Sequence, residues 1–168
     1  SALMLSGAGS LGPFHIGVVQ TMFQEGILPR VISGASAGSM VAAVVCTRTD
    51  EELHELFASD QLNDLFGEME GAETGKRISQ ENVRGLIEAL IPDMTFIEAF
   101  EKTGRYINVS VAAKEVMQRS RILNSTTSPT ALIREAVLAS CAIPGIFPPV
   151  TLAARNSKGK KIAYVPSR

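Results

Sequence analysis

The chain has 168 residues, 45% of them hydrophobic, and a formal net charge of −1. This length and apolar content suffice for a single domain with a substantial core, which we expect to span residues 1–168. The near-neutral charge and the scattered basic residues give no electrostatic footprint for nucleic acid, so no nucleic-acid partner is expected. Two cysteines among small apolar neighbours favour buried free thiols over a disulfide, and no metal-ligand spacing occurs.

The first part of the chain alternates between strand and helix. A short apolar strand over residues 2–5 is followed by a glycine-rich turn over residues 7–12. The spacing of apolar residues then predicts a helix from about Pro13 to Glu25, which Gly26 ends in a left-handed cap. Residues 31–33 form a second, very short strand. This order indicates a strand–helix–strand unit.

The same alternation continues to the end of the chain. The remaining predicted elements, in chain order, are a small-residue helix ending near Thr47, a helix opened by a capping box at Thr49, a loop over residues 67–77, a helix opened by a second capping box at Thr95, strands at residues 106–112 and 122–123, a helix from Ser128-Pro129 to about Ser140, and strands near residues 150–152 and 162–165. Strands that alternate with helices predict an α/β fold with a largely parallel sheet.

The strongest local pattern is Gly34-Ala35-Ser36-Ala37-Gly38, between a strand and a helix. A nucleophile on such a sharp turn needs small neighbours, because the two arms of the turn approach closely. The helix that follows directs its positive end at the site, where it favours developing negative charge. The pattern predicts that Ser36 is a nucleophile, although a tight turn with an incidental serine gives the same five residues.

The glycine-rich turn is the second pattern, and it has two interpretations. Its unobstructed backbone N–H groups can form an oxyanion hole. The spacing of Gly7, Gly9 and Gly12 also fits a dinucleotide-binding loop, which would make the protein a nucleotide-dependent oxidoreductase. That fingerprint requires an acidic residue about 20 positions further on. The chain has the serine turn there instead, so the oxyanion interpretation is favoured.

The sequence gives a weaker indication of the group that would accept the proton of Ser36. The chain has two histidines, and His15 is better explained by support of the glycine loop than by catalysis. His54 falls in a charged helix. A dyad of serine and a carboxylate, without histidine, is therefore the more economical hypothesis.

Taken together, the motifs resemble the patatin-like phospholipase family. The glycine loop over residues 6–12 is similar to the family's oxyanion motif, and residues 34–38 are similar to its nucleophile elbow, framed by Gly34 and Gly38. Residues 139–149 are similar to its helix-to-loop segment. Residues 14–19 and 28–34, with the segment that begins at Cys46, resemble the branch that contains triacylglycerol lipases and related bacterial proteins.

The resemblance implies a three-layer α/β fold and hydrolysis of phospholipid or neutral-lipid esters by a Ser–Asp dyad. On that pattern Ser36 would attack the ester, the aspartate would accept its proton, and backbone N–H groups around Gly7, Ala8 and Gly9 would hold the oxyanion. Neither a cofactor nor a metal is implied. The implied partner is a lipid ester, and peripheral contact with a membrane or a lipid droplet is expected.

The chain departs from the family pattern in two ways. Leu11 stands where the glycine loop usually carries a basic residue. The family's aspartate lies in an Asp-Gly motif, and no Asp-Gly occurs among these residues. The aspartates present are Asp50, Asp60, Asp64 and Asp93. We therefore expect the domain to be truncated at its C-terminal end, before the general base. A catalytically silent lipid-binding or interaction module on the same fold is the alternative function.

Overall fold

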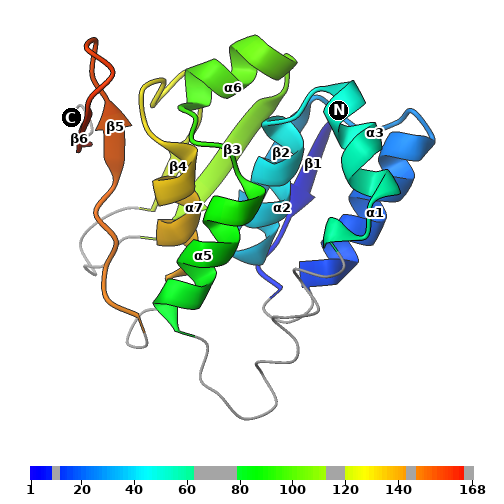
Figure 1. Cartoon of the computed structure of the whole chain (residues 1–168), viewed down its shortest axis with the longest axis horizontal. Helices are drawn as coiled ribbons and strands as arrows, with labels where there is room; N and C mark the ends of the chain where they lie inside the picture. Colours follow the sequence, from blue (N-terminus) through cyan, green and yellow to red (C-terminus); the bar gives the residue numbers. More distant parts are fainter. Residues whose placement is uncertain (9–11, 63–78, 113–119, 143–146, 165–168) are drawn as a thin grey trace.

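The described residues form a four-stranded sheet against which the helices pack (Figure 1). The structure, a computed structural model, describes residues 1–8, 12–62, 79–112, 120–142 and 147–164. The strands are β1 (Ala2–Leu5), β2 (Val31–Ala35), β3 (Tyr106–Val111) and β4 (Arg121–Leu123), with a separate antiparallel pair of β5 (Ala153–Arg155) and β6 (Lys161–Ala163). The sheet order is β1-β2-β3-β4, with β1, β2 and β3 parallel and β4 antiparallel to β3. The predicted α/β fold with a largely parallel sheet is confirmed.

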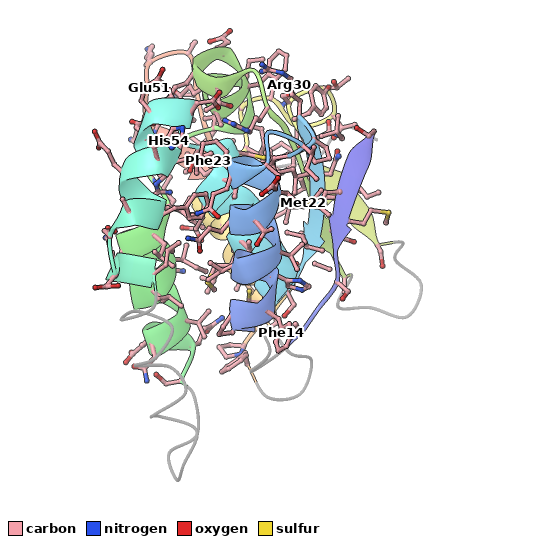
Figure 2. All side chains as sticks on the ribbon, turned by 90° about the vertical axis from the view of Figure 1, so that its right-hand side faces the viewer. Phe14, Met22, Phe23, Arg30, Glu51 and His54 are labelled. Atoms are coloured by element: carbon pink, nitrogen blue, oxygen red, sulfur yellow. The ribbon has the colours of Figure 1, made fainter. Side chains whose placement is uncertain are left out.

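The helices pack in successive layers against this sheet. They are α1 (Gly12–Gln24), α2 (Ala37–Cys46), α3 (Asp50–Ala58), α5 (Gln80–Leu90), α6 (Phe96–Thr103) and α7 (Ile133–Cys141). α2 and α7 contact the strands directly, α1 lies beside α2, and α5 packs on α7. Seen from the side, the described helices lie on one side of the sheet (Figure 2).

Two helices begin as their capping boxes predict. The Thr49 hydroxyl accepts a hydrogen bond from the Glu52 N–H, and the Glu52 carboxylate accepts one at 2.8 Å from the Thr49 N–H. The Thr95 and Glu98 pair repeats this arrangement at the start of α6, with a distance of 2.7 Å. Each box satisfies backbone donors that the first helical turn leaves without partners.

The core is built around α2. Every residue of this helix from Gly38 to Cys46 is buried, because small and β-branched side chains let it lie close to the strands on one side and to the other helices on the other. Ile32 of β2 and Ile107 of β3 face it and are buried as well. Since α2 starts directly after Ser36, this buried helix also holds the candidate site in place.

The predicted start of the last helix is wrong. Ser128-Pro129 does not cap α7, which begins at Ile133 after Leu132. Residues 129–130 form a turn, and Ala131 and Leu132 are then held by the β5 strand: Ala131 bridges Ala154, and the Leu132 N–H donates to the Ala153 carbonyl at 2.8 Å. These contacts with a distant segment prevent the helix from starting earlier.

Two further differences from the prediction concern the final strands, β5 and β6, and the helix α5. The final strands lie at Ala153–Arg155 and Lys161–Ala163, because the Asn156 side chain accepts hydrogen bonds from the Lys158 and Lys160 N–H groups and so fixes the turn between them. The helix α5 was not predicted, although Ser79 caps it and its buried residues recur at helical spacing. The predicted loop over residues 67–77 lies outside the described residues.

Candidate active site

Ser36 lies on a sharp turn between β2 and α2. Its backbone has φ 50° and ψ −125°, and it is the only non-glycine residue with positive φ in the described part of the chain. Such a conformation costs about 1–3 kcal/mol and persists only where the surroundings enforce it. The strand–turn–helix context predicted for a nucleophile elbow is therefore present.

Two glycines allow this turn to form. A Cβ atom on Gly34 would lie 2.5 Å from the Cα atom of Ser39, and one on Gly38 would lie 2.6 Å from the Ser6 carbonyl oxygen. Real Cβ contacts are almost never shorter than 3.0 Å. Gly34 therefore lets α2 fold back over β2, and Gly38 lets α2 approach the end of β1.

The glycine-rich loop lies beside Ser36. A Cβ atom on Gly7 would be 3.5 Å from the Ser36 Cβ atom, and the parallel pairing of β1 with β2 brings the ends of both strands to the same edge of the sheet. Ala8 is half-buried next to it, while Gly9, the third predicted oxyanion residue, lies outside the described residues. His15 contacts this loop, because its Nε2 atom lies 2.9 Å from the Ser6 carbonyl oxygen. That contact agrees with a supporting role for His15.

Three polar side chains lie around Ser36, and none of them has a role that the sequence predicts. The Ser39 hydroxyl donates to the Ser36 carbonyl at 2.6 Å. The Ser36 N–H donates to the Ser140 hydroxyl at 2.8 Å. Cys141 also faces Ser36 and Ser39, and burial raises the pKa of its thiol to about 11, against the lowering effect of hydrogen bonds with these two serines. The thiol is therefore protonated at neutral pH.

Asp50, Asp93 and His54 make their contacts away from Ser36. Asp50 pairs with Arg105, and Asp93 pairs with Arg155 at 3.0 Å. The His54 ring packs edge-on against Phe23, with 4.8 Å between ring centres. In the parts of the chain that the structure describes, no hydrogen bond joins Ser36 to a carboxylate or to a histidine. Asp64 lies outside those parts.

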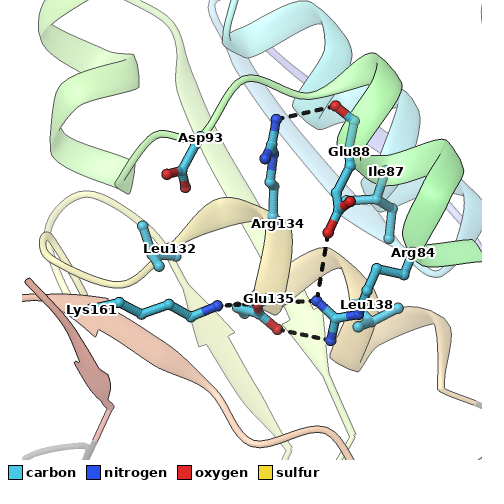
Figure 3. Close-up of a pocket in the computed structure, with 9 residues that line it drawn as sticks. All are labelled: Arg84, Ile87, Glu88, Asp93, Leu132, Arg134, Glu135, Leu138 and Lys161. Carbon is cyan, nitrogen blue, oxygen red and sulfur yellow. Dashed lines mark hydrogen bonds and ion pairs between the residues drawn. The ribbon is translucent and has the colours of Figure 1, made fainter. Parts of the chain in front are cut away.

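A separate pocket of about 140 Å³ lies between α5, α7 and β6 (Figure 3). Its main feature is Glu135, whose side chain is only 8% exposed and which bonds Arg84 at 3.3 Å and Lys161 at 2.6 Å. Burial opposes ionisation of this carboxyl, but the hydrogen bonds and charges of Lys161 and Arg84 outweigh it and hold the pKa below its ordinary value. The two ion pairs of Glu135 therefore connect α7 to Arg84 of α5 and to Lys161 of β6.

No metal or membrane-spanning feature was found among the residues that the structure describes. No group of three or more histidine, cysteine, aspartate or glutamate side chains is placed there to hold a metal ion. None of the described helices is both long enough and apolar enough to cross a membrane.

Comparisons with known proteins match nearly the whole chain. Residues 3–165 match the family described as patatin-like phospholipase. A triacylglycerol lipase of Arabidopsis thaliana is 37% identical over 175 residues, covering 99% of this chain and 22% of the relative. A triacylglycerol lipase of Schizosaccharomyces pombe is 35% identical over 173 residues, covering 98% of this chain and 28% of the relative. The chain thus spans less than a third of these relatives' length.

One solved structure has a similar fold. It is the heterodimeric complex ExoU–SpcU from the type III secretion system of Pseudomonas aeruginosa, with a TM-score of 0.50 and 16% sequence identity. The match covers 88% of this chain and 37% of that chain. At this identity the likeness supports the fold class alone, a three-layer α/β fold.

Proposed function

The chain belongs to the patatin-like phospholipase family, and we propose that it contributes the nucleophile and the oxyanion loop of a lipid acyl hydrolase. The observation that carries this proposal is the backbone of Ser36. A serine is held at φ 50° at the N-terminus of a buried helix, with Gly7 beside it. A strained, tightly enforced conformation at such a position is typical of a reacting side chain.

In the proposed reaction, the Ser36 hydroxyl attacks the carbonyl carbon of a lipid ester. Its proton passes to an aspartate, the carbonyl oxygen becomes negative, and the alcohol leaves with a proton from the same aspartate. Water then hydrolyses the acyl-serine by the reverse sequence of proton transfers. Backbone N–H groups of Gly7, Ala8 and Gly9 stabilise the oxyanion, each contributing about 3 kcal/mol to the transition state. The chemistry requires no metal.

We propose that the aspartate of this dyad comes from outside the 168 residues. Two observations support this: Asp50 and Asp93 are engaged by arginines, and no Asp-Gly pair occurs in the sequence. The chain matches only 22% and 28% of the length of two such relatives, so relatives of this kind have further residues that could supply an aspartate. The substrate class is a phospholipid or a triacylglycerol: the family name supports the first, and the relatives named triacylglycerol lipases support the second.

The outer face of α1 supports contact with a lipid surface. The helix contains no aspartate, glutamate, lysine or arginine. Phe14 is 76% exposed, and Val18, one turn later, is 46% exposed. Figure 2 places Phe14 at the end of α1 that follows the glycine loop. An apolar, uncharged face beside the proposed site suits an uncharged lipid surface, such as that of a lipid droplet or a zwitterionic membrane.

The test is ester hydrolysis by the full-length protein. Turnover of a short-chain nitrophenyl ester should be abolished in Ser36→Ala. It should be retained in Ser33→Ala, a matched change three residues earlier, where the side chain accepts a hydrogen bond from Asn108 at 3.1 Å. If Ser36→Ala keeps the turnover of the wild type, Ser36 is not the nucleophile. The silent lipid-binding module then becomes the better account of the fold.

A further inference from the structure

A single hydroxyl, that of Ser140, connects three segments at the candidate site. It lies in the last turn of α7, accepts a hydrogen bond from the Ser36 N–H at 2.8 Å, and donates one to the Ser110 carbonyl at 2.6 Å. Ser110 is the β3 residue that pairs with Ala35, directly before the turn. A serine hydroxyl has one proton to donate and can accept at the same time, so both bonds form together.

The N–H group that Ser140 binds is one that the helix cannot satisfy. Ser36 is the N-cap of α2, where backbone donors have no partner within the helix. Its carbonyl, by contrast, accepts from the N–H groups of Ser39 and Met40 and from the Ser39 hydroxyl. Ser140 therefore supplies the contact that holds the strand side of the turn, while Ser39 holds the helix side.

We propose that Ser140 is a positioning residue for the reaction of Ser36, an inference that rests on the function proposed above. It fixes the Ser36 N–H against β3, and thereby holds the backbone at the positive φ that directs the serine side chain out of the turn. Because the N–H is already bound to Ser140, it does not serve as an oxyanion donor, and that task stays with the glycine loop. Ser140 acts through Ser36 and does not itself react.

The test compares three variants of the full-length protein. Ser140→Ala removes both hydrogen bonds, and Ser140→Thr restores a hydroxyl that can make them. Ser128→Ala is the control, because Ser128 is a buried serine whose hydroxyl accepts from the Tyr164 hydroxyl at 2.8 Å in a different part of the fold. Ser140→Cys is added in case the alanine variant folds poorly, since it keeps a side chain of similar size with much weaker hydrogen bonds.

Two readouts are measured for each variant, together with the melting temperature. The first is hydrogen–deuterium exchange of the Ser36 amide, which needs no catalysis. The second is the rate at which a fluorophosphonate forms an adduct on Ser36. Ser140→Ala should speed the exchange about fivefold, as expected for the loss of one hydrogen bond. It should slow adduct formation about tenfold or more, because misplaced reacting groups lose rate steeply.

Ser140→Thr should return both the exchange rate of the Ser36 amide and the rate of adduct formation most of the way to the wild-type values. Ser128→Ala should change the melting temperature alone. The proposal is overturned if Ser140→Ala, or Ser140→Cys in its place, leaves either readout at the wild-type value. A wild-type protein that forms no adduct on Ser36 refutes the proposed function instead. In that case the amide exchange still decides whether Ser140 holds the turn.

Discussion

Replacing Gly38 by alanine should open the contact between α2 and β1. The new methyl group would lie 2.6 Å from the Leu5 carbonyl carbon and from the Ser6 oxygen, about 0.8 Å inside the 3.4 Å of ordinary contact, and closer still to the Leu5 oxygen. These are backbone atoms at the end of a strand and cannot rotate away. Overpacking of side chains costs about 1–3 kcal/mol, and a backbone clash should reach about 3 kcal/mol or more. For a domain of this size that corresponds to a fall in melting temperature of about 6–12 °C.

The matched control is Gly85→Ala in α5, where an added Cβ meets nothing within 4 Å. There alanine should raise the free energy of unfolding by about 0.5–1 kcal/mol, because glycine weakens a helix interior. Thermal or urea unfolding of both variants measures the difference. A Gly38→Ala protein as stable as the wild type would refute the claim that close approach of α2 to β1 requires glycine here.

Three further predictions follow from buried or exposed side chains. The pKa of Glu135 is lowered in the folded state, so its contribution to stability is complete above the ordinary value of 4.5 and is lost as the pH falls through the folded-state value. Urea unfolding should therefore give Glu135→Gln a smaller free energy of unfolding than the wild type at pH 7, and this difference should narrow below pH 4.5. A difference that stays constant with pH would contradict the prediction. Burial raises the pKa of Cys46 to about 12, so a thiol reagent should modify it only on unfolding, and rapid modification in the native state would refute its burial. Phe14→Ser should weaken flotation with uncharged lipid vesicles and leave hydrolysis of a soluble ester unchanged. Ile122→Ser, at another exposed apolar side chain, should leave flotation unchanged. If both variants lose flotation equally, α1 is not the lipid-binding surface.

The local rules of the sequence predicted the elements near the site well. The capping boxes at Thr49 and Thr95 and the left-handed Gly26 depend on neighbouring residues, so a short window of sequence contains the cause. The run of glycine and alanine around Ser36 indicates the sharp turn in the same local way. The proximity of the glycine loop to Ser36 was also predictable. It follows from the rule that loops after adjacent parallel strands share one edge of the sheet.

Features that depend on distant contacts were not predictable in the same way. Leu132 is held in extended conformation by Ala153, so the cap-like Ser128-Pro129 sequence does not start a helix. The bond between Ser36 and Ser140 joins residues 104 positions apart, and a serine at a helix end carries no sequence signal for such a role.

Mass spectrometry of the full-length protein after treatment with a fluorophosphonate tests the central claim most directly. The account predicts a single adduct, mapped to Ser36, and no adduct in the Ser36→Ala variant. It also predicts that ester hydrolysis disappears in step with adduct formation. An adduct on a different serine, or full hydrolysis by a protein that is completely modified at Ser36, would contradict the assignment of Ser36 as the nucleophile.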